Sequence, residues 1–506
     1  MRKLFLALVV LGAFCLSAAA QNYTIQQYLN IRSASSPALS PDGRRMAYLT
    51  NVTGTSQIWM MDLSPGGAAK QITNYEDNVG FVRWSPAGNG LVFGKARGGD
   101  ENTQFFLMSN DGSQIKELTN NPKVRHNFGD WSKDGRLIYY ASNKRDRNFF
   151  DVYSMEVATG KEELVFQQNG SNNFAAASDD GRFVIISRSG TELSLDNNLY
   201  LIDVRTKKET LLTPHTDASQ FGDVEFLPGG DSIILSANSD REFASLAQIN
   251  NLRAGGENKM SYVDKNAAWD TESIEISPRG DLLAYTVNRE GFSELNLRRI
   301  QTGGKPLVSN LNSKNETVKL PAQGIVGGLA FSGDGTKLAF TFSAAKYNTD
   351  IWLYDLKSKK TAQITRSDRA GIAQESFVEP QLIKYKTFDG REIPAWYYKP
   401  IDKHGFMFIG QVGKTKNGEK QKKIGLPTLP VIVSVHGGPE GQERPGFNPL
   451  YQYFLSRGYA ILATNVRGST GYGKTFTHLD DVEKREDSVK DLAFAVEWLK
   501  TAGGAD

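Results

Sequence analysis

A four-residue turn sequence recurs seven times before residue 340, and each copy precedes a strand-like run. The copies occupy residues 40–43, 85–88, 132–135, 178–181, 227–230, 277–280 and 332–335, with the pattern Ser-Pro-Asp-Gly and its variants. Proline and aspartate favour the early turn positions, and glycine suits the position that needs a left-handed backbone. The copies are roughly 45 to 55 residues apart, which is the spacing of β-propeller blades. Because a single blade cannot cover both faces of its sheet, the repeat predicts an all-β propeller of seven blades.

Other residues within the repeats fit the same interpretation. Second strands are expected at 57–63, 104–109, 151–157, 198–204 and 350–356, and threonine-ended edges at 71–73, 117–119, 211–213 and 363–365. Four tryptophans of this region are interpreted as blade packing rather than substrate contacts, namely Trp59, Trp84, Trp131 and Trp352. His126 and His215 are isolated in the sequence and are expected to be structural or solvent-facing. Residues 145–147 are interpreted as a solvated charged loop.

The first twenty residues have the features of a secretory signal peptide. Arg2 and Lys3 form a basic start, residues 4–16 an apolar core, and three alanines end at Ala20. This pattern predicts cleavage after residue 20 and export to the periplasm or the exterior; the alternative is an N-terminal membrane anchor. Cleavage would remove Cys15, the single cysteine, so the mature chain is expected to fold without disulfides. No later stretch is apolar enough to predict a membrane span.

Composition excludes several function classes. The formal net charge is +3 at pH 7, and no basic stripe indicates nucleic-acid binding. No Walker loop, zinc motif or dinucleotide fingerprint occurs, so neither a cofactor nor a metal is predicted. His478 lies near Asp480 and Asp481, but one histidine beside two aspartates is weak evidence for a metal site.

The repeat period stops near residue 376, and a different architecture is expected from there to residue 506. Two strands, 379–385 and 392–399, flank a hairpin turn at Asp389 and Gly390. Residues 402–429 are lysine-rich and are expected to form an exposed loop, or alternatively a contact with an anionic surface. A helix around 451–457 lies between two apolar strands, 431–435 and 459–464. The first of these is predicted to be buried on both faces of a parallel sheet.

Residues 483–500 are predicted to form a helix that ends near Gly503 and Gly504. Its apolar residues recur with helical spacing and are expected to make one buried face. That face comprises Val489, Leu492, Ala493, Val496 and Leu499. Residues 21–375 are therefore interpreted as the propeller with a short N-terminal helix at 26–30, and residues 376–506 as the first part of an α/β domain.

Two loops give the α/β region a specific resemblance. His-Gly-Gly-Pro at 436–439 and Asn-Val-Arg-Gly-Ser-Thr-Gly-Tyr-Gly at 465–473 resemble the hydrolase domain of the prolyl oligopeptidase family, closest to its acylaminoacyl-peptidase and dipeptidyl-peptidase branches. The repeats resemble that family's propeller and also Tol-associated propellers. The resemblance implies an incomplete α/β-hydrolase domain, in which the Gly438 N–H is an oxyanion donor. Pro439 has no N–H, and His436 would be a loop residue rather than the catalytic base. The alternative is that both glycines serve a plain tight turn.

The family's nucleophile belongs to a Gly-x-Ser-x-Gly elbow, and this motif occurs nowhere in the 506 residues. The segment 468–471 is one residue short of it. The chain is therefore expected to end before the catalytic triad. Two hypotheses follow. The first is an exported serine peptidase that hydrolyses short peptides through an acyl-enzyme, of which this chain lacks the nucleophile, aspartate and histidine. The second is a non-catalytic periplasmic propeller that binds a protein or peptide partner.

Overall fold

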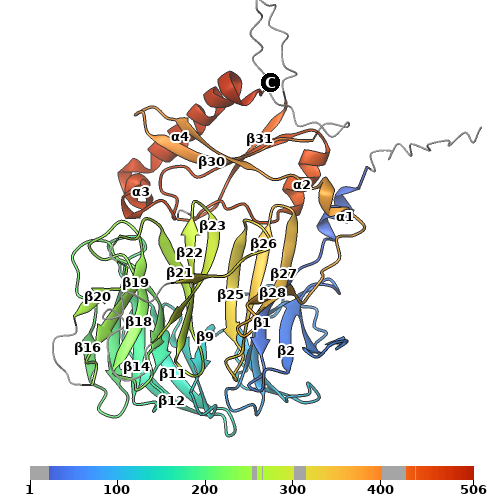
Figure 1. Ribbon diagram of the computed structural model, residues 1–506. Helices are drawn as coiled ribbons and strands as arrows, with labels where there is room; N and C mark the ends of the chain where they lie inside the picture. Colours follow the sequence, from blue (N-terminus) through green and yellow to red (C-terminus); the bar gives the residue numbers. More distant parts are fainter. Residues whose placement is uncertain are drawn as a thin grey trace, which may run out of the picture.

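The computed structural model describes residues 22–253, 259–264, 266–300, 315–401, 429–438 and 440–505. Within them, residues 34–363 form seven four-stranded antiparallel sheets, in which consecutive strands are neighbours (Figure 1). The first four sheets comprise β1 (Ala34–Leu39), β2 (Arg45–Thr50), β3 (Gln57–Asp62), β4 (Ala69–Gln71); β5 (Val79–Trp84), β6 (Leu91–Lys95), β7 (Gln104–Met108), β8 (Ile115–Glu117); β9 (His126–Trp131), β10 (Leu137–Asp146), β11 (Phe149–Glu156), β12 (Lys161–Phe166); β13 (Asn172–Ala177), β14 (Phe183–Ser189), β15 (Asn197–Asp203) and β16 (Glu209–Leu211). The last three comprise β17 (Phe221–Phe226), β18 (Ser232–Ala237), β19 (Ser245–Asn250), β20 (Met260–Tyr262); β21 (Asp270–Ile276), β22 (Leu282–Arg289), β23 (Phe292–Arg299), β24 (Glu316–Thr317); β25 (Ile325–Phe331), β26 (Lys337–Ala344), β27 (Tyr347–Asp355) and β28 (Lys360–Gln363).

Each repeated tetrapeptide joins the first and second strands of a sheet, so the predicted strand after each turn is confirmed and the strands expected at 57–63 and its equivalents are the third of their sheets. In the first copy the Ser40 hydroxyl donates to Asp42 Oδ1 at 2.6 Å and accepts the Arg45 N–H at 2.9 Å. Gly43 has φ +65°, the left-handed conformation expected of the last turn position. The same pair of serine bonds recurs in the copies that begin at Ser132, Ser178 and Ser332. The serine therefore closes the turn and fixes the register of the strand that follows it.

The threonines that end four of the repeats have a defined role. The hydroxyl of Thr73 accepts the N–H of Ile58 at 2.9 Å, inside the core of the first sheet. Thr119, Thr213 and Thr365 accept a strand N–H in the same way, at 2.8 to 2.9 Å. All four hydroxyls pair a buried backbone donor that would otherwise lack an acceptor, because the outer strand ends there.

The first and seventh sheets pack against each other. Ala34 and Tyr48 share a core cluster with Ala339 and Ile351, and Trp59 packs against it. Trp84 and Trp131 are buried between other neighbouring sheets, which confirms the packing role expected for tryptophans of the repeats. The expectation of a solvated loop at residues 145–147 is wrong for Arg145, because its guanidinium pairs with the buried Asp151 at 2.5 Å.

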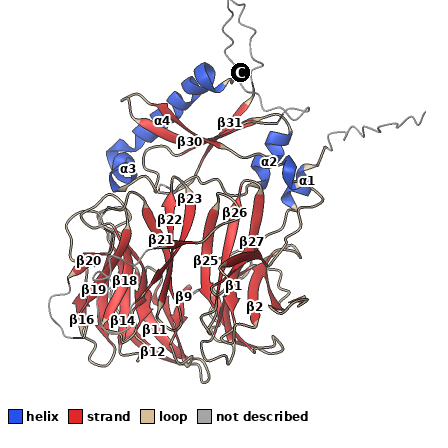
Figure 2. Ribbon diagram, in the orientation of Figure 1, coloured by secondary structure: helices blue, strands red, loops and turns tan. Residues whose placement is uncertain are grey.

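The C-terminal part is one small sheet with helices beside it, on the far side from the repeat turns (Figure 2). It contains β29 (Gln381–Lys386), β30 (Glu392–Tyr398), β31 (Val431–Val435), β32 (Ala460–Thr464), α2 (Pro449–Ser456), α3 (Lys474–Thr477) and α4 (Arg485–Trp498), and α4 continues as a π-helical turn, Leu499–Gly503. The strand order is β29-β30-β32-β31, and only β31 and β32 run parallel. The predicted hairpin at Gly390 is confirmed, with φ +80° at that glycine.

Two expectations for this sheet are wrong. The strand β31 is not buried on both faces: it has a single neighbour in the described residues, and Val435 is 45% exposed. The helix α4 is present, and of its predicted buried face Leu499 is buried and Leu492 half-buried, but the other three residues are exposed. Val489 is 62% exposed and Val496 is 39% exposed, whereas Ser488, Asp491 and Ala495 are buried. Asp491, whose charged pair is described below, lies on the inward side of α4 together with Ala495 and Leu499.

An aromatic cluster joins the C-terminal sheet to the chain's beginning. The helix α1 (Ile25–Leu29), capped by Thr24, lies beside α2, and Tyr28 contacts Tyr453 with ring centroids 5.7 Å apart. Phe377 contacts Phe447 at 5.0 Å in the same cluster. A 3-10 turn, η2 (Gln374–Ser376), leads into this region. In the described part of the chain, no helix has the length and apolar character needed to cross a membrane.

Candidate active site

The glycine loop after β31 takes a conformation that only glycine adopts easily. Gly438 is exposed and has φ +142°, and a Cβ there would lie 2.6 Å from the Glu440 nitrogen. No acceptor for its N–H occurs among the residues that the structure describes. The loop follows the carboxyl end of a parallel strand, which is where ligands bind in α/β sheets. The assignment of Gly438 as an oxyanion donor stays a prediction, and its geometry is compatible with that role.

The histidine of this loop connects it to the second predicted loop. His436 Nε2 lies 2.8 Å from the Ser469 hydroxyl, and Nδ1 lies 3.1 Å from the Gly437 carbonyl. Ser469 is fully buried and donates to the Val466 carbonyl at 2.6 Å. Thr470 N–H donates to the Gly441 carbonyl at 2.8 Å. The two loops are therefore tied together by side-chain and backbone bonds.

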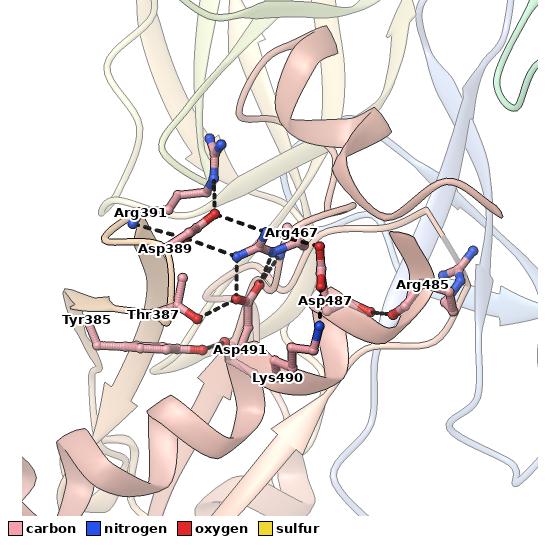
Figure 3. A network of polar contacts seen from close by, with 11 residues as sticks. Tyr385, Thr387, Asp389, Arg391, Arg467, Arg485, Asp487, Lys490 and Asp491 are labelled. Atoms are coloured by element: carbon pink, nitrogen blue, oxygen red, sulfur yellow. Dashed lines mark hydrogen bonds and ion pairs between the residues drawn. The ribbon is translucent and has the colours of Figure 1, made fainter. Parts of the chain in front are cut away.

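The second loop is anchored by a buried arginine, shown in Figure 3. Arg467 donates from Nε and Nη2 to the two oxygens of Asp491, both at 2.9 Å, and its backbone N–H donates to the same carboxylate at 3.0 Å. Thr387 adds a hydroxyl donor to Asp491 at 2.7 Å. Asp389 Oδ2 accepts a hydrogen bond from Nη1, the remaining guanidinium nitrogen of Arg467, at 3.2 Å. A buried carboxylate with this many donors is well compensated for its lost hydration.

This network joins three elements that are distant in sequence. Asp389 lies in the turn between β29 and β30, Arg467 in the loop after β32, and Asp491 in α4 (Figure 3). The loop that carries Ser469 and Thr470 is thereby attached to α4 and to the β29–β30 turn. The sequence contains no signal for this pairing beyond an arginine in the motif, because the partner carboxylates are 24 and 78 residues away.

A cavity of about 450 Å³ lies next to the second loop, between it and the propeller strands. Thr470 and Gly471 form its border on the α/β side. On the propeller side, the start of β17, the start of β21 and the end of β22 contribute Asp223, Asp270, Glu272 and Asn288. Sequence reasoning did not find these residues, because the carboxylates become neighbours only when separate blades assemble.

The cavity carboxylates differ in how fully they are paired. Glu272 receives Arg444 Nη1 at 3.0 Å and Asn288 Nδ2 at 2.9 Å, so its charge is largely matched. Asp196 accepts from His215 Nε2, at 2.9 Å, and from the Ser219 N–H. Among the described residues, Asp270 accepts one bond, of 2.7 Å, from the Ala244 N–H. Burial raises the pKa of Asp270 to about 6, the Ala244 bond opposes that rise, and Glu272 adds to it. Asp223 likewise accepts one bond, from the Ser273 N–H at 3.1 Å, so Asp223 and Asp270 are the cavity carboxylates with the fewest partners among the described residues.

The other histidines do not form a metal site in the described residues. His478 Nδ1 pairs with Asp481 at 2.8 Å, and no group of three potential metal ligands occurs there. His215 is isolated in the sequence, but in the structure it pairs with Asp196 beside the cavity. His126 is buried in the propeller at 5% exposure.

Comparison with known proteins agrees with this arrangement of a β-propeller and an α/β sheet. Residues 20–269 match the TolB beta propeller domain, and residues 445–506 match the prolyl oligopeptidase family. Dipeptidyl aminopeptidase BIII of Pseudoxanthomonas mexicana is 23% identical over 476 residues, which are 92% of this chain and 64% of that protein. A prolyl endopeptidase of Elizabethkingia miricola is 21% identical over 74% of this chain and 47% of its own length. The chain thus spans less than two thirds of either relative.

A solved structure from a study of two prolyl endopeptidases has the same fold. It superposes with a TM-score of 0.72 at 15% identity and covers 95% of this chain and 68% of its own. The fold is thus a β-propeller joined to an α/β sheet. The chain is similar to the prolyl oligopeptidase family in its residues 445–506 and to the peptidases named above over most of its length.

Proposed function

We propose that this chain is the propeller and the first part of the α/β-hydrolase domain of an exported serine peptidase that hydrolyses short peptides through an acyl-enzyme. In this proposal the seven sheets of residues 21–375 form a closed seven-bladed propeller, and residues 376–506 begin the hydrolase domain. Residues 1–20 are the signal peptide that directs export to the periplasm or the exterior. The observation that carries the proposal is the Gly438 loop: its N–H has no acceptor among the described residues, and the loop is tied to the border of a carboxylate-lined cavity.

The cavity favours the dipeptidyl-peptidase type over the acylaminoacyl type. A dipeptidyl peptidase must hold a charged substrate amine, whereas an acylated end is neutral. Asp270 lines the cavity, one of its carboxylate oxygens has no partner among the described residues, and Glu272 lies on the same strand. A carboxylate that is partly removed from water binds a charged amine more strongly than it binds a neutral acylated end. The relative from Pseudoxanthomonas mexicana is also named a dipeptidyl aminopeptidase.

The nucleophile, aspartate and histidine are proposed to lie outside the 506 residues. No Gly-x-Ser-x-Gly occurs in them, and β31 has an open edge that can pair with a further parallel strand. A strand added there would end beside the Gly438 loop, because parallel strands end at the same edge of a sheet. A nucleophile elbow after that strand would place its hydroxyl near the predicted oxyanion donor.

The test compares two chains with a chromogenic free-amine dipeptide substrate. The 506-residue chain is expected to show no turnover, and a longer chain that supplies a Gly-x-Ser-x-Gly elbow is expected to show turnover that a serine-directed phosphonate abolishes. Turnover by the 506-residue chain itself would contradict the proposed location of the nucleophile. A longer chain that binds peptides without cleaving them would favour the alternative, a non-catalytic periplasmic propeller with a peptide or protein partner.

A further inference from the structure

The turn between β14 and β15 carries a leucine in a backbone conformation that leucine rarely adopts. Leu195 has φ +53°, in the left-handed region that glycine, asparagine and aspartate enter more easily than residues with an apolar side chain. In the described part of the chain, most of the other non-glycine residues with a positive φ are polar. Strained residues of this kind gather at binding sites, where the surrounding structure holds them in place.

The residues on both sides of Leu195 are held by hydrogen bonds. After it, the Asp196 carboxylate has the two donors described above, and the Asp196 carbonyl accepts the Gly190 N–H at 2.7 Å. Before it, the Ser194 hydroxyl donates to Glu440, which follows the glycine loop of the α/β sheet. These bonds fix the turn at its base and at its contact with the α/β sheet, so the Leu195 side chain is presented in one place.

Leu195 is the large apolar side chain that the cavity leaves accessible. It lines the cavity of about 450 Å³ and also the smaller hollow that extends from it toward α3, and Asp270 and Thr470 border the same two spaces. The rest of the cavity lining is mostly polar. Of the other apolar residues in that lining, Phe221 is buried at 4% exposure and Ala244 is small, whereas Leu195 is half-buried.

We propose that Leu195 is a specificity-determining residue, which packs against an apolar side chain on the substrate residue that carries the free amine. This inference rests on the proposed function, in which Asp270 receives that amine. The side chain of an N-terminal residue branches from the carbon next to its amine, so an amine at Asp270 brings the side chain to the residues that share its border. An apolar side chain there covers Leu195 and removes apolar surface of both partners from water. A polar side chain loses hydration without gaining a partner on Leu195.

Two dipeptide amides test this preference by calorimetric titration of the 506-residue chain. Leucyl-alanine amide and asparaginyl-alanine amide have the same free amine and nearly the same size, and they differ in the polarity of the first side chain. The wild type should bind the leucyl peptide roughly tenfold or more tightly, because an apolar contact discriminates between side chains on this scale. Equal affinities for the two peptides, or no binding of either, would overturn the inference.

Substitutions of Leu195 separate binding from folding. Leu195→Asn changes the polarity at nearly constant size, and asparagine suits the left-handed backbone better than leucine does. This variant should fold, with a Tm no lower than that of the wild type, and should lose the preference for the leucyl peptide. Leu195→Met remains apolar and should keep the preference. If Leu195→Met loses it as Leu195→Asn does, or if Leu195→Asn keeps it, Leu195 does not select the side chain.

Leu193→Asn is the matched control for the same chemical change. Leu193 lies on the same turn, is 46% exposed and is not among the residues that surround the cavity or the smaller hollow. Leu193→Asn should therefore retain the wild-type preference between the two peptides. If it loses that preference as Leu195→Asn does, a polar substitution anywhere on the turn has the same effect and the inference fails.

The result is distinguishable from failure of the proposed function. If the preference depends on Leu195 but the longer chain does not hydrolyse peptides, the binding site for the side chain stands and the peptidase proposal fails. If the longer chain hydrolyses chromogenic leucyl-alanyl and asparaginyl-alanyl substrates with equal kcat/KM, the peptidase proposal stands and this inference fails. In an active longer chain, Leu195→Asn should lower kcat/KM for the leucyl substrate roughly tenfold or more, with a smaller effect on the asparaginyl substrate.

Discussion

His126 is a buried base whose neutral form the fold favours. Its ring packs against Phe105 and Tyr140, with centroids 5.5 and 5.6 Å apart, and Nδ1 has no hydrogen-bond partner in the described residues. Burial lowers its pKa to about 4, the nearby Glu162 opposes that shift, and Lys144 adds to it. The unfolded chain binds a proton near pH 6.5, so the stabilisation is present above that pH and is lost as the pH falls toward 4.

The expected size of this effect is about 2 kcal/mol of unfolding free energy lost between pH 7 and pH 5. His126→Phe should lack that part of the acid sensitivity, although its absolute stability can differ from wild type. Urea unfolding at the two pH values, compared between wild type and variant, measures the difference. Equal pH dependence in the two proteins would show that His126 is not the group responsible.

Asp270 provides a second test at the level of one side chain. If its carboxylate holds a substrate amine, Asp270→Asn should weaken the binding of a free-amine dipeptide to the 506-residue chain roughly tenfold or more. An N-acetylated dipeptide should bind wild type and variant alike. Binding to the wild type should strengthen as the pH rises through about 6, because Asp270 ionises while the amine remains protonated.

Calorimetric titration of both peptides measures this. Asp42→Asn is the matched control, since Asp42 lies in a repeat turn at the opposite end of the sheets from the cavity. If Asp42→Asn weakens binding as much as Asp270→Asn does, or if both peptides respond equally, Asp270 does not recognise the amine.

At the scale of elements, α4 depends on the pair between Arg467 and Asp491. Removing one partner leaves a buried charge without its main compensation, which typically costs about 3 to 5 kcal/mol. Asp491→Ala should therefore release α4 and the loop around Ser469 while the propeller remains folded. Limited proteolysis should show early cleavage in the C-terminal part. Arg467→Met combined with Asp491→Leu should be cut more slowly than Asp491→Ala, because no charge remains buried. Equal cleavage of both variants would contradict this.

The same helix shows how far sequence reasoning reaches. Turn chemistry is local, so the Ser-Pro-Asp-Gly copies and the Gly390 hairpin were predictable from neighbouring residues. The position of α4 was also predictable, but its inward face was not. Apolar periodicity cannot anticipate that Asp491 is buried by an arginine from another segment. The valine-rich β31 has the composition of a strand in the interior of a sheet, and the sequence therefore predicts that both faces are buried. In the described residues β31 has one neighbouring strand, β32, and this could not be predicted from composition.

At the scale of the whole molecule, the two ends of the interface between the propeller and the C-terminal sheet differ in chemistry. Beside α1 and α2 the contact is apolar and aromatic, through Tyr28, Phe377 and Tyr453. Beside α3 it is polar, and the loop that precedes α3 borders the cavity through Thr470 and Gly471. Glu242 accepts from the hydroxyl of Thr475 at 2.6 Å and from its N–H at 2.9 Å, and Lys474 pairs with Asp217. Polar contacts at an exposed edge open more easily than a packed core, so we expect the α3 side to open first.

Glu242→Ala removes both side-chain bonds to Thr475, each of which contributes about 1 kcal/mol. The amides of α3 should then exchange hydrogen for deuterium roughly 5 to 30 times faster, because local opening costs that much less. Glu242→Gln, which keeps an acceptor oxygen, should show a smaller increase. The amides of α1 and α2 should not change, since the apolar cluster is intact. Faster exchange at α1 and α2 together with α3 would mean that the C-terminal sheet separates from the propeller as one body. In that case the α3 edge would not open on its own as an entrance to the cavity.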